Sequence, residues 1–324
     1  MLPNPDLLAR PATRREAVST SALEGTYATL SDVFEADFLE RGQMSASVSE
    51  VQNYVSAAEH AYGWLAEGRP ITLSMIEQLH QVLIDGTPSD GPEAGHVRTT
   101  QVFIGAGRGR VPTARYVPPP PGDLLRDGLL DWEQWIRQPS STPSLIRIAA
   151  AHYQFESLHP CNDGNGRLGR LIAVLQLMAY RELRYPILNI SPWLERNRTE
   201  YLDQLLRVST TGEWDNWVQF FCAAVHAESI EVVSRVDRLV SLRSDFHQRL
   251  VAARVKGVAL RIADDLIGYP MITATLASEL YGVSYQAANQ AIKRLTELGI
   301  LKQRGSGRYD RIFSSGAVLQ ALDY

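Results

Sequence analysis

The chain has 324 residues, of which 45% are hydrophobic and 21% are charged, with a formal net charge of −4. This length predicts two domains, or one large domain with an appendage, and the composition excludes disordered, collagen-like and low-complexity proteins. The longest apolar run, near residues 171–180, is interrupted by Gln176 and is far shorter than the ~20 residues that span a bilayer. We therefore expect no membrane-spanning segment.

The N-terminal residues and the two cysteines indicate the cellular compartment. The first residues lack the basic start and apolar stretch of a signal peptide. The two cysteines, Cys161 and Cys222, occur in no metal-binding or redox spacing, which excludes a zinc cluster and fits a reducing compartment. We expect a cytoplasmic protein, in which any nucleic-acid binding would come from a local basic patch.

Helical periods dominate the first two thirds of the chain. Apolar residues recur at intervals of three and four, with polar faces between them. The segments with this pattern are 51–66, 72–84, 124–137, 144–156, 168–182, 200–208 and 214–236. The body is therefore predicted to be mainly α.

Strand patterns in this body are confined to residues 101–105 and 114–117. A Gly- and Arg-rich stretch, 106–110, separates them, and prolines 118–121 follow. The pattern predicts a small β-hairpin between helices.

Residues 226–249 form a long helical pattern with an apolar stripe. The stripe contains Val232, Val236, Leu239, Phe246 and Leu250. It lasts too few heptads to indicate a coiled coil, so we favour a helix packed on the chain's own core. A homodimer seam is the alternative.

After Gly257 the pattern changes to short helical segments followed by short β segments. Helical patterns at 258–267, 275–281 and 285–298 are followed by short β patterns at 300–303 and 309–313, with Ser284 placed as an N-cap. This order resembles a winged helix-turn-helix domain. Residues 284–311 hold six basic and two acidic side chains, and Lys293, Arg304 and Arg308 are the candidate contacts to DNA phosphates. A winged helix used for protein contacts or dimerisation remains equally open.

The chemistry concentrates in the run from His159 to Arg170. A helix ends before Pro160, and a new amphipathic helix begins near Gly166. The loop between them meets a helix N-terminus, where free N–H groups and flexible glycines form an anion site. Arg167 and Arg170, three positions apart, can bind adjacent phosphates.

Two further side chains complete this candidate site. Asp163 offers the hard oxygen ligand that magnesium requires when it bridges phosphates. His159 offers a general base whose ordinary pKa is ~6.5. A capped turn with a purely structural role would explain Asp163 and one glycine, but not His159, Asn165 and both arginines together.

Other motif interpretations fit less well. Residues 164–169 match GxGxxG, but a dinucleotide fingerprint follows a strand, whereas this run follows a helix. The sequence contains no Walker motif, no HExxH and no GxSxG.

The run resembles the signature of the Fic family, HxFx[DE]GNGRxxR. The matching residues are His159, Asp163, Gly164, Asn165, Gly166, Arg167 and Arg170. Cys161 replaces the usual Phe, so we expect looser packing of the loop without loss of chemistry. Residues 95–98, 102–105 and 116–120 resemble the β-hairpin flap of that family, and the likeness covers roughly residues 10–225.

The resemblance implies protein adenylylation, in which AMP passes from ATP to a Ser, Thr or Tyr hydroxyl of a target protein or of the chain itself. It implies that His159 is the base, that Asp163 binds magnesium, and that Gly164, Asn165 and Gly166 hold the α-phosphate. Arg167 would bind the β-phosphate and Arg170 the γ-phosphate.

The flap residues Val102, Phe103 and Ile104 would pair with an extended target segment. An ordinary surface hairpin is the alternative for this segment.

Two other functions stay open. One is a DNA-binding regulator whose Fic-like body only senses a nucleotide; an intact His159 argues against it, because a sensor needs no base. The other is a Fic enzyme that uses a different phosphate-containing donor or removes AMP.

Residues 20–25 have two interpretations. Locally they indicate a short amphipathic helix that Gly25 ends. Beside the signature, Thr20, Glu24 and Gly25 resemble the family's inhibitory motif [ST]xxxE[GN]. The resemblance implies that Glu24 pairs with Arg170 and blocks the productive pose of ATP.

The predicted architecture is mainly α, with a Fic-type helical bundle and β-hairpin flap before the winged helix. We expect an N-terminal helical region with the inhibitory helix at 1–90 and the catalytic core at 91–225. A connecting helix follows at 226–257, and the winged-helix domain occupies 258–324.

Overall fold

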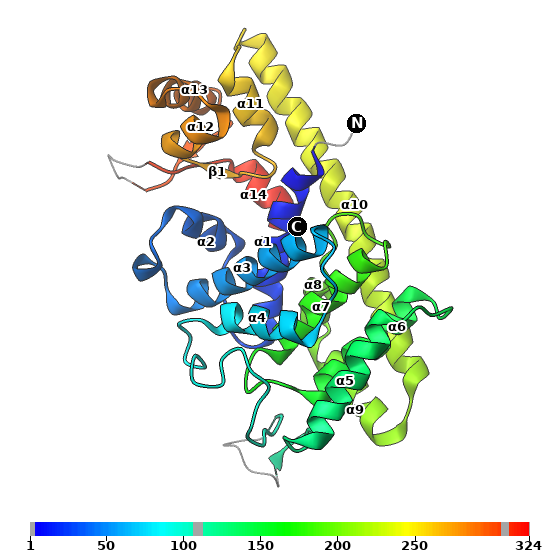
Figure 1. The fold of residues 1–324 in the computed structure, drawn as a ribbon. Helices are drawn as coiled ribbons and strands as arrows, with labels where there is room; N and C mark the ends of the chain where they lie inside the picture. Colours follow the sequence, from blue (N-terminus) through cyan, green and yellow to red (C-terminus); the bar gives the residue numbers. More distant parts are fainter. Residues whose placement is uncertain (1–3, 106–112, 306–310, 324) are drawn as a thin grey trace. The chain divides into compact units, whose positions relative to one another are not determined.

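The computed structural model describes residues 4–105, 113–305 and 311–323, and it is mainly helical, as predicted (Figure 1). Within these ranges no helix is both long enough and apolar enough to cross a bilayer.

The chain divides into two compact units, each built from separate stretches. The first unit contains the residues up to 15, residues 28–44 and those from 230 onwards. The second unit contains residues 16–27 and 45–229. The candidate site lies in the second unit, and the predicted winged helix lies in the first.

The second unit is a bundle of helices. They are α3 (Ala46–Ala66), α4 (Leu73–Ile84), α5 (Asp123–Arg137), α6 (Ser144–Leu158), α7 (Asn165–Ala179), α8 (Ser191–Arg196), α9 (Arg198–Thr211) and the first part of α10 (Trp214–Ala252). Helix α3 packs on α4, α5 on α6, and α6 on α7. Each helical pattern of the sequence corresponds to one of these helices, whereas α8 was not predicted.

Helix α7 differs from the prediction in its burial. Its side chains are buried from Asn165 to Leu177, so it is not the amphipathic helix that we expected. The reason is that α3, α4 and α6 all pack against it, and a helix enclosed on several sides has no solvent face. The helix also ends at Ala179 rather than at residue 182.

Two tryptophans fix α6, the helix that leads to His159. Trp132 of α5 donates from Nε1 to the carbonyl of Ala151 at 2.9 Å, and Trp217 of α10 donates to that of Ala149 at 2.8 Å. Both indole rings are buried. Such contacts combine a large apolar area with a satisfied N–H group, so they hold α6 firmly within the bundle.

The predicted hairpin is present only in reduced form. Ile104 and Tyr116 form an isolated antiparallel bridge, in which the Ile104 N–H donates to the Tyr116 carbonyl at 3.0 Å. The rest of 101–105 and 114–117 is not strand, and residues 106–112 lie outside the described residues. The two segments therefore lie side by side without forming a ladder.

The first unit contains the remaining elements. They are α2 (Leu30–Glu35), the last part of α10, α11 (Val258–Asp265), β1 (Met271–Ile272), α12 (Ala274–Tyr281), α13 (Tyr285–Glu297), β2 (Lys302–Gln303), β3 (Phe313–Ser314) and α14 (Gly316–Asp323), with 3₁₀ turns at Ala36–Phe38 and Arg41–Gln43. The strands form an antiparallel sheet in the order β1-β3-β2. Met271 pairs with Ser314, and Gln303 pairs with Phe313.

Several predictions for this unit are confirmed. Ser284 caps α13, because its Oγ accepts from the Ala287 N–H at 3.2 Å. The apolar stripe of α10 is largely buried, with Leu239 and Phe246 at most 3% exposed, which supports packing on the chain's own core. β1 and α14 were not predicted, because two-residue strands and short terminal helices give almost no periodic signal. Of the second β pattern, 309–313, residues 309 and 310 lie outside the described residues.

Helix α1 (Pro5–Leu23) is longer than the short helix predicted around residues 20–25. Pro11 lies inside it, and an internal proline ordinarily breaks a helix. Tertiary contacts compensate: Arg10 and Arg14 donate to Asp37 at 2.6 and 2.8 Å, and the Arg10 guanidinium lies 4.5 Å from the centre of the Tyr269 ring.

Candidate active site

The candidate site is built on the loop that joins α6 to α7. Helix α6 ends at His159, which adopts the left-handed conformation with φ 48°, and Gly164 adopts it again with φ 75° before α7 begins. The Asn165 side chain accepts from the Cys161 N–H at 2.8 Å and donates to the Cys161 carbonyl at 2.7 Å. These bonds close the loop on itself.

This geometry refines the expected role of Asn165. Its side-chain amide is 2% exposed and fully used inside the loop. The expected phosphate contact would therefore come from backbone N–H groups at the start of α7 rather than from this amide.

His159 lies buried at the end of α6. Its Nδ1 is 3.3 Å from the Glu156 carbonyl, and the tautomer that donates there leaves Nε2 free to accept a proton. Burial lowers the pKa of the imidazole to about 4, whereas we expected an ordinary value near ~6.5. His159 is consequently neutral at pH 7, the form that a general base requires.

Asp163 is half-exposed, and its carboxylate is already partly coordinated. Oδ2 accepts from the Ser89 hydroxyl at 2.6 Å, Oδ1 accepts from the Gly164 N–H at 2.6 Å, and Arg167 lies 3.6 Å away. Burial raises the pKa of Asp163, but these hydrogen bonds and the Arg167 charge together lower it. The group is an ionised hard oxygen ligand at neutral pH.

A metal held by the protein alone does not fit this site. Within the described ranges, no group of three or more His, Cys, Asp or Glu side chains is placed to bind a metal ion. Magnesium commonly takes one carboxylate and completes its shell with phosphate oxygens and water. Asp163 fits that mode of binding.

The buried Arg167 guanidinium has donors that make no hydrogen bond within the described part of the chain. The residue is 3% exposed, and its Nη1 is 3.6 Å from Glu50. Neither Nε nor Nη1 has a hydrogen-bond partner among the described residues. Buried guanidinium donors without hydrogen-bond partners are costly, and the Glu50 and Asp163 carboxylates, each 3.6 Å away, offset part of that cost.

Arg170, by contrast, is fully engaged by α1. Its Nε donates to the Thr20 hydroxyl at 2.7 Å, and its Nη2 donates to the Thr20 carbonyl at 3.0 Å and to Glu24 Oε1 at 2.6 Å. The arginine is 1% exposed. Burial lowers the pKa of Arg170, but Glu24, Tyr201 and Glu156 together with the hydrogen bond to Glu24 outweigh that effect and raise it. The pairing that the inhibitory motif implied is present.

Two glycines make this contact possible. Gly25 ends α1 with φ 91°, and the Thr26 N–H donates back to the Ser21 carbonyl at 2.9 Å. At Gly166 a Cβ atom would lie 2.1 Å from Glu24 Oε1 and 2.8 Å from Arg170 Nη1. Only glycine at 166 leaves room for the carboxylate and the guanidinium together.

A cavity of about 320 Å³ lies beside these groups. Its lining includes His159, Gly166, Arg170, Glu24, Glu156, Arg198, Ile104, Tyr116, Tyr201 and the leucines 23, 202, 205 and 206. Asp163, Asn165 and Arg167 do not line it. The cavity on the side of His159 therefore combines leucine side chains with charged groups, and it excludes the carboxylate of Asp163 and the guanidinium of Arg167.

Three residues at the site were not singled out from the sequence. His80 of α4 accepts from the Gly95 N–H at 3.0 Å and therefore donates from Nε2 to the Asp163 carbonyl at 3.2 Å. Glu156 lines the cavity, and burial raises its pKa to about 7. Arg98 donates to the His159 carbonyl at 2.8 Å. The only signal for Glu156 is its spacing of three before His159 on one helix; the other two depend on tertiary contacts.

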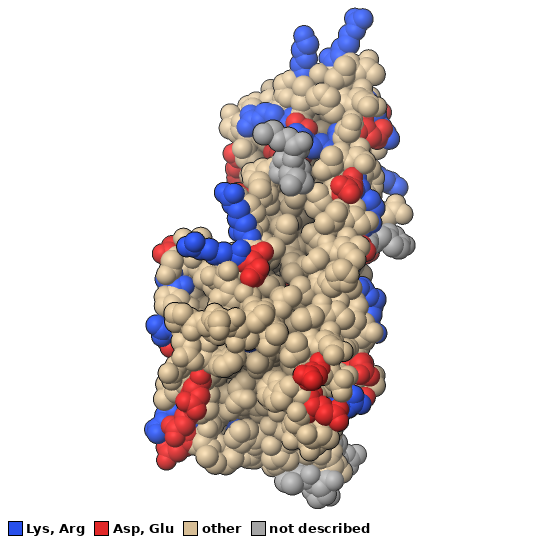
Figure 2. Space-filling model, turned by 90° about the vertical axis from the view of Figure 1, so that its right-hand side faces the viewer, with Lys and Arg blue, Asp and Glu red and all other residues tan. Residues whose placement is uncertain are grey.

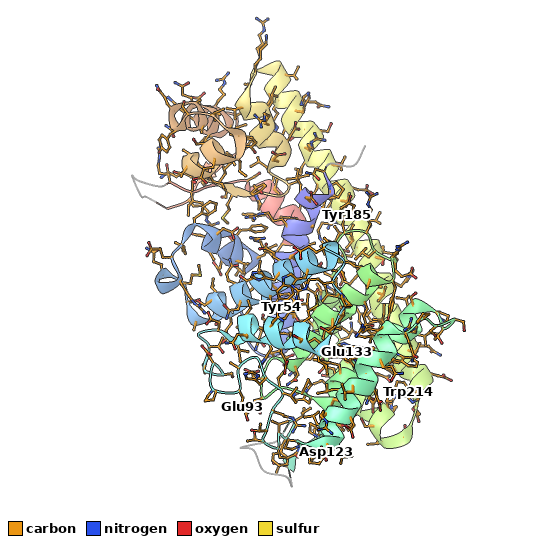
Figure 3. The ribbon with its side chains drawn as sticks, viewed as in Figure 1. Tyr54, Glu93, Asp123, Glu133, Tyr185 and Trp214 are labelled. Carbon is orange, nitrogen blue, oxygen red and sulfur yellow. The ribbon has the colours of Figure 1, made fainter. Side chains whose placement is uncertain are left out.

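The segment before the flap also supports the loop. Glu93, labelled in Figure 3, accepts from the Thr99 N–H at 3.2 Å and from the side-chain amide of Asn162. The flap residues Val102, Phe103 and Ile104 are half-buried, and of these three only Ile104 lines the cavity.

The proposed DNA contacts, which lie in the first unit, differ from one another. Lys293 is exposed on α13. Arg304 is bound to Glu35 at 2.8 Å and to the Ser31 hydroxyl at 2.9 Å, so it is not free for a phosphate in this conformation. Arg308 lies outside the described residues. Figure 2 shows basic and acidic side chains interspersed on the face that it displays.

Comparison with known proteins gives two matches to family profiles and several relatives. Residues 1–63 match the profile described as "Fic/DOC family N-terminal", and residues 70–177 match "Fic/DOC family". "Protein adenylyltransferase Fic" of Drosophila yakuba is 27% identical over 251 residues, which are 74% of this chain and 47% of that protein. "Protein adenylyltransferase fic-1" of Caenorhabditis briggsae is 31% identical over 165 residues, 50% of this chain and 28% of that protein. The chain spans less than half the length of these relatives.

A solved structure shares the fold. The crystal structure of a Fic family protein from Desulfovibrio desulfuricans G20 aligns with a TM-score of 0.59 at 21% identity, covering 95% of this chain and 87% of that one.

The hydrogen bonds between the Asn165 side chain and the Cys161 backbone can be tested by measuring the free energy of unfolding. Asn165→Ala leaves the Cys161 N–H and carbonyl without partners, so we expect a loss of about 1–3 kcal/mol in the free energy of unfolding. Asn162→Ala, three residues away on the exposed side of the loop, removes a hydrogen bond to Glu93 but leaves no buried backbone group unpaired, so it should cost less than Asn165→Ala, about 0.5–1 kcal/mol. Urea denaturation followed by circular dichroism measures both values. Equal losses would show that the Asn165 amide does not hold the loop.

Proposed function

This chain belongs to the Fic/DOC family, and we propose that it is a protein adenylyltransferase that transfers AMP from ATP to a Ser, Thr or Tyr hydroxyl. The observation that supports this most directly is the neutral, buried His159 beside the free N-terminus of α7. The boundaries that we propose are 91–225 for the catalytic core and 258–324 for the winged helix.

In this proposal His159 acts as the general base. The hydroxyl oxygen of the target attacks the α-phosphorus, and the bond from that phosphorus to the oxygen bridging to the β-phosphate breaks. His159 accepts the hydroxyl proton, and pyrophosphate leaves with the bridging oxygen. The pKa of about 4 keeps the imidazole in its neutral, proton-accepting form at physiological pH, and negatively charged phosphates bound nearby would raise this pKa toward the operating pH, where a general base is most effective.

The phosphates would be bound by the groups around the loop. The backbone N–H groups of Asn165 and Gly166 at the start of α7 would bind the α-phosphate, and that of Gly164 would join them once it exchanges its hydrogen bond to Asp163 for one to the phosphate. The unpartnered Arg167 donors suit the β-phosphate, and Arg170 suits the γ-phosphate once Glu24 is displaced. Magnesium bound by Asp163 would neutralise phosphate charge during the transfer.

The flap would hold the target. Val102, Phe103 and Ile104 present a short extended segment whose one strand partner among the described residues is Tyr116. An extended peptide that pairs with this segment would bring its hydroxyl toward the cavity that His159 and Ile104 line. Self-modification would use the same geometry.

We further propose that Glu24 inhibits the enzyme. A carboxylate 2.6 Å from Arg170 occupies the position that the γ-phosphate requires, and it neutralises the guanidinium that would bind it. The productive pose of ATP is therefore excluded while α1 remains in place.

A second candidate function is a nucleotide-sensing regulator that binds DNA. It is favoured by one observation, the element order α11-β1-α12-α13-β2-β3 with its antiparallel sheet, which is typical of a winged helix. The exposed face of α13, with Gln286, Gln290 and Lys293, suits a nucleic-acid groove. Intact His159 favours the enzyme. A different nucleotide donor, or removal of AMP, would use the same residues.

The first test concerns the base. His159→Ala should lower transfer from α-labelled ATP by at least about 100-fold, because it removes the proton acceptor, while the affinity for ATP stays unchanged. The effect is measured as the rate of label transfer by the Glu24→Gly variant and by the Glu24→Gly, His159→Ala double variant. Equal rates would place the chemistry elsewhere, and transfer from γ-labelled ATP would indicate a different donor reaction. Asp163→Ala should lose both the rate and its dependence on magnesium.

The second test concerns inhibition. Glu24→Gly should raise label transfer by about tenfold or more over wild type, because it frees Arg170 without adding bulk. Glu24→Gln, which keeps the shape and removes the charge, should give a smaller increase. Identical rates of wild type and Glu24→Gly at saturating ATP would exclude the inhibitory role.

The third test concerns DNA. If Lys293, Arg304 and Arg308 contact phosphates, the logarithm of duplex affinity should fall with the logarithm of salt by about 0.9 per contact. Changing all three to Glu should remove binding, whereas Arg126→Glu, on the exposed face of α5 in the other unit, should not. Absence of duplex binding at low salt would leave protein contacts or dimerisation as the role of the winged helix.

A further inference from the structure

Arg98 makes an unusual set of contacts. Its side chain is 2% exposed, and it donates to the carbonyls of four residues: Leu158 at 3.4 Å, His159 at 2.8 Å, Thr100 at 2.9 Å and Pro119 at 2.5 Å. Its own N–H also donates to the Pro160 carbonyl at 2.8 Å. Within the described part of the chain, all of these hydrogen bonds go to backbone oxygens and none to a carboxylate.

These partners belong to two parts of the site. Leu158 and His159 form the end of α6, where carbonyls lose their helical partners and the chain turns left-handed. Within the flap, Thr100 lies before the Ile104–Tyr116 bridge and Pro119 lies after it. One guanidinium therefore connects the backbone of the base to both ends of the flap.

We infer that Arg98 is a positioning residue that fixes the His159 backbone relative to the flap, and hence the base relative to the target hydroxyl. This inference rests on the proposed adenylyltransfer. The transfer requires the imidazole, the target hydroxyl and the α-phosphorus to be aligned. Arg98 holds both the His159 backbone and the flap that would bind the target, so it fixes the imidazole relative to the hydroxyl.

The physical chemistry explains why the residue is an arginine. Burying a cation without a counter-ion is costly, and the cost is offset only if its donors are satisfied. The planar guanidinium has five donors in a fixed arrangement, whereas an ammonium is a point charge with three. The positive charge also interacts favourably with the C-terminal end of α6. Lysine at this position would keep the charge and lose the simultaneous contacts.

The chain provides a matched control in Arg147. This arginine is also buried, at 7% exposure, and it also donates to backbone carbonyls, those of Trp135 and Gln138 at 2.7 Å each. It lies in the same unit at the start of α6, away from His159 and the flap. Arg147→Lys therefore reproduces the chemical change of Arg98→Lys without touching the site.

The first experiment measures self-modification of the full chain with α-labelled ATP and magnesium, in the Glu24→Gly background. Arg98→Lys should lower the rate constant at saturating ATP by about 100-fold, the size of effect that a misalignment near 1 Å produces. The dissociation constant for ATP, measured by calorimetry, should change less than about threefold, because Arg98 contacts no phosphate-binding group. Arg147→Lys should leave both quantities within about threefold. Equal losses in the two variants, or a loss confined to ATP affinity, would overturn the inference.

The second experiment does not depend on activity. Hydrogen exchange of wild type and both variants should show faster exchange in Arg98→Lys at two segments together, residues 158–161 and the flap ends, and no such change in Arg147→Lys. If Glu24→Gly itself transfers no label, the proposed function fails, and this exchange pattern alone decides the role of Arg98. Faster exchange at only one segment, or unfolding of both Arg98→Lys and Arg98→Gln at 20 °C by circular dichroism, would show that Arg98 is a general stabilising residue.

Discussion

The structure depends on how a buried guanidinium is neutralised. Arg170 is almost completely excluded from water, and a charge in that environment requires partners of opposite sign or strong acceptors. The chain supplies them from α1, through the hydroxyl and carbonyl of Thr20 and the carboxylate of Glu24. In the function that we propose, this guanidinium would bind a phosphate of ATP, and the Glu24 carboxylate would then occupy the same place.

The loop before α7 follows from a different constraint, the unsatisfied ends of two helices. Carbonyls at the end of α6 and N–H groups at the start of α7 both need partners. Arg98 donates to the carbonyls, the Asn165 side chain closes the loop, and the Asp163 carboxylate accepts from the Gly164 N–H at the start of α7. Two left-handed residues, His159 and Gly164, let the chain reverse within this short distance. The rigidity of the loop thus comes from groups that do not react.

The sequence predicted those features that are local or that a motif encodes. The helical periods located most helices, the His159–Arg170 run located the loop, and the likeness of residues 20–25 to the inhibitory motif located Glu24 as the partner of Arg170. It did not predict the enclosure of α7, because a 3.6-residue period says nothing of how many neighbours a helix has. Arg98 and His80 were missed for a related reason. Their partners are backbone oxygens and N–H groups at other places in the chain. Nearly every residue carries the same backbone groups, so the sequence does not indicate which of them a side chain will contact.

The position of Glu24 on the chain itself has a consequence for how the site responds to its surroundings. A carboxylate that is part of the same molecule acts at a fixed effective concentration, set by the helix that carries it rather than by the amount of protein. Dilution cannot release it, and a free acid in solution cannot substitute for it at ordinary concentrations. In the inhibition that we propose, the balance between bound and released Glu24 would therefore be an intrinsic constant of the folded chain, altered by whatever displaces the end of α1.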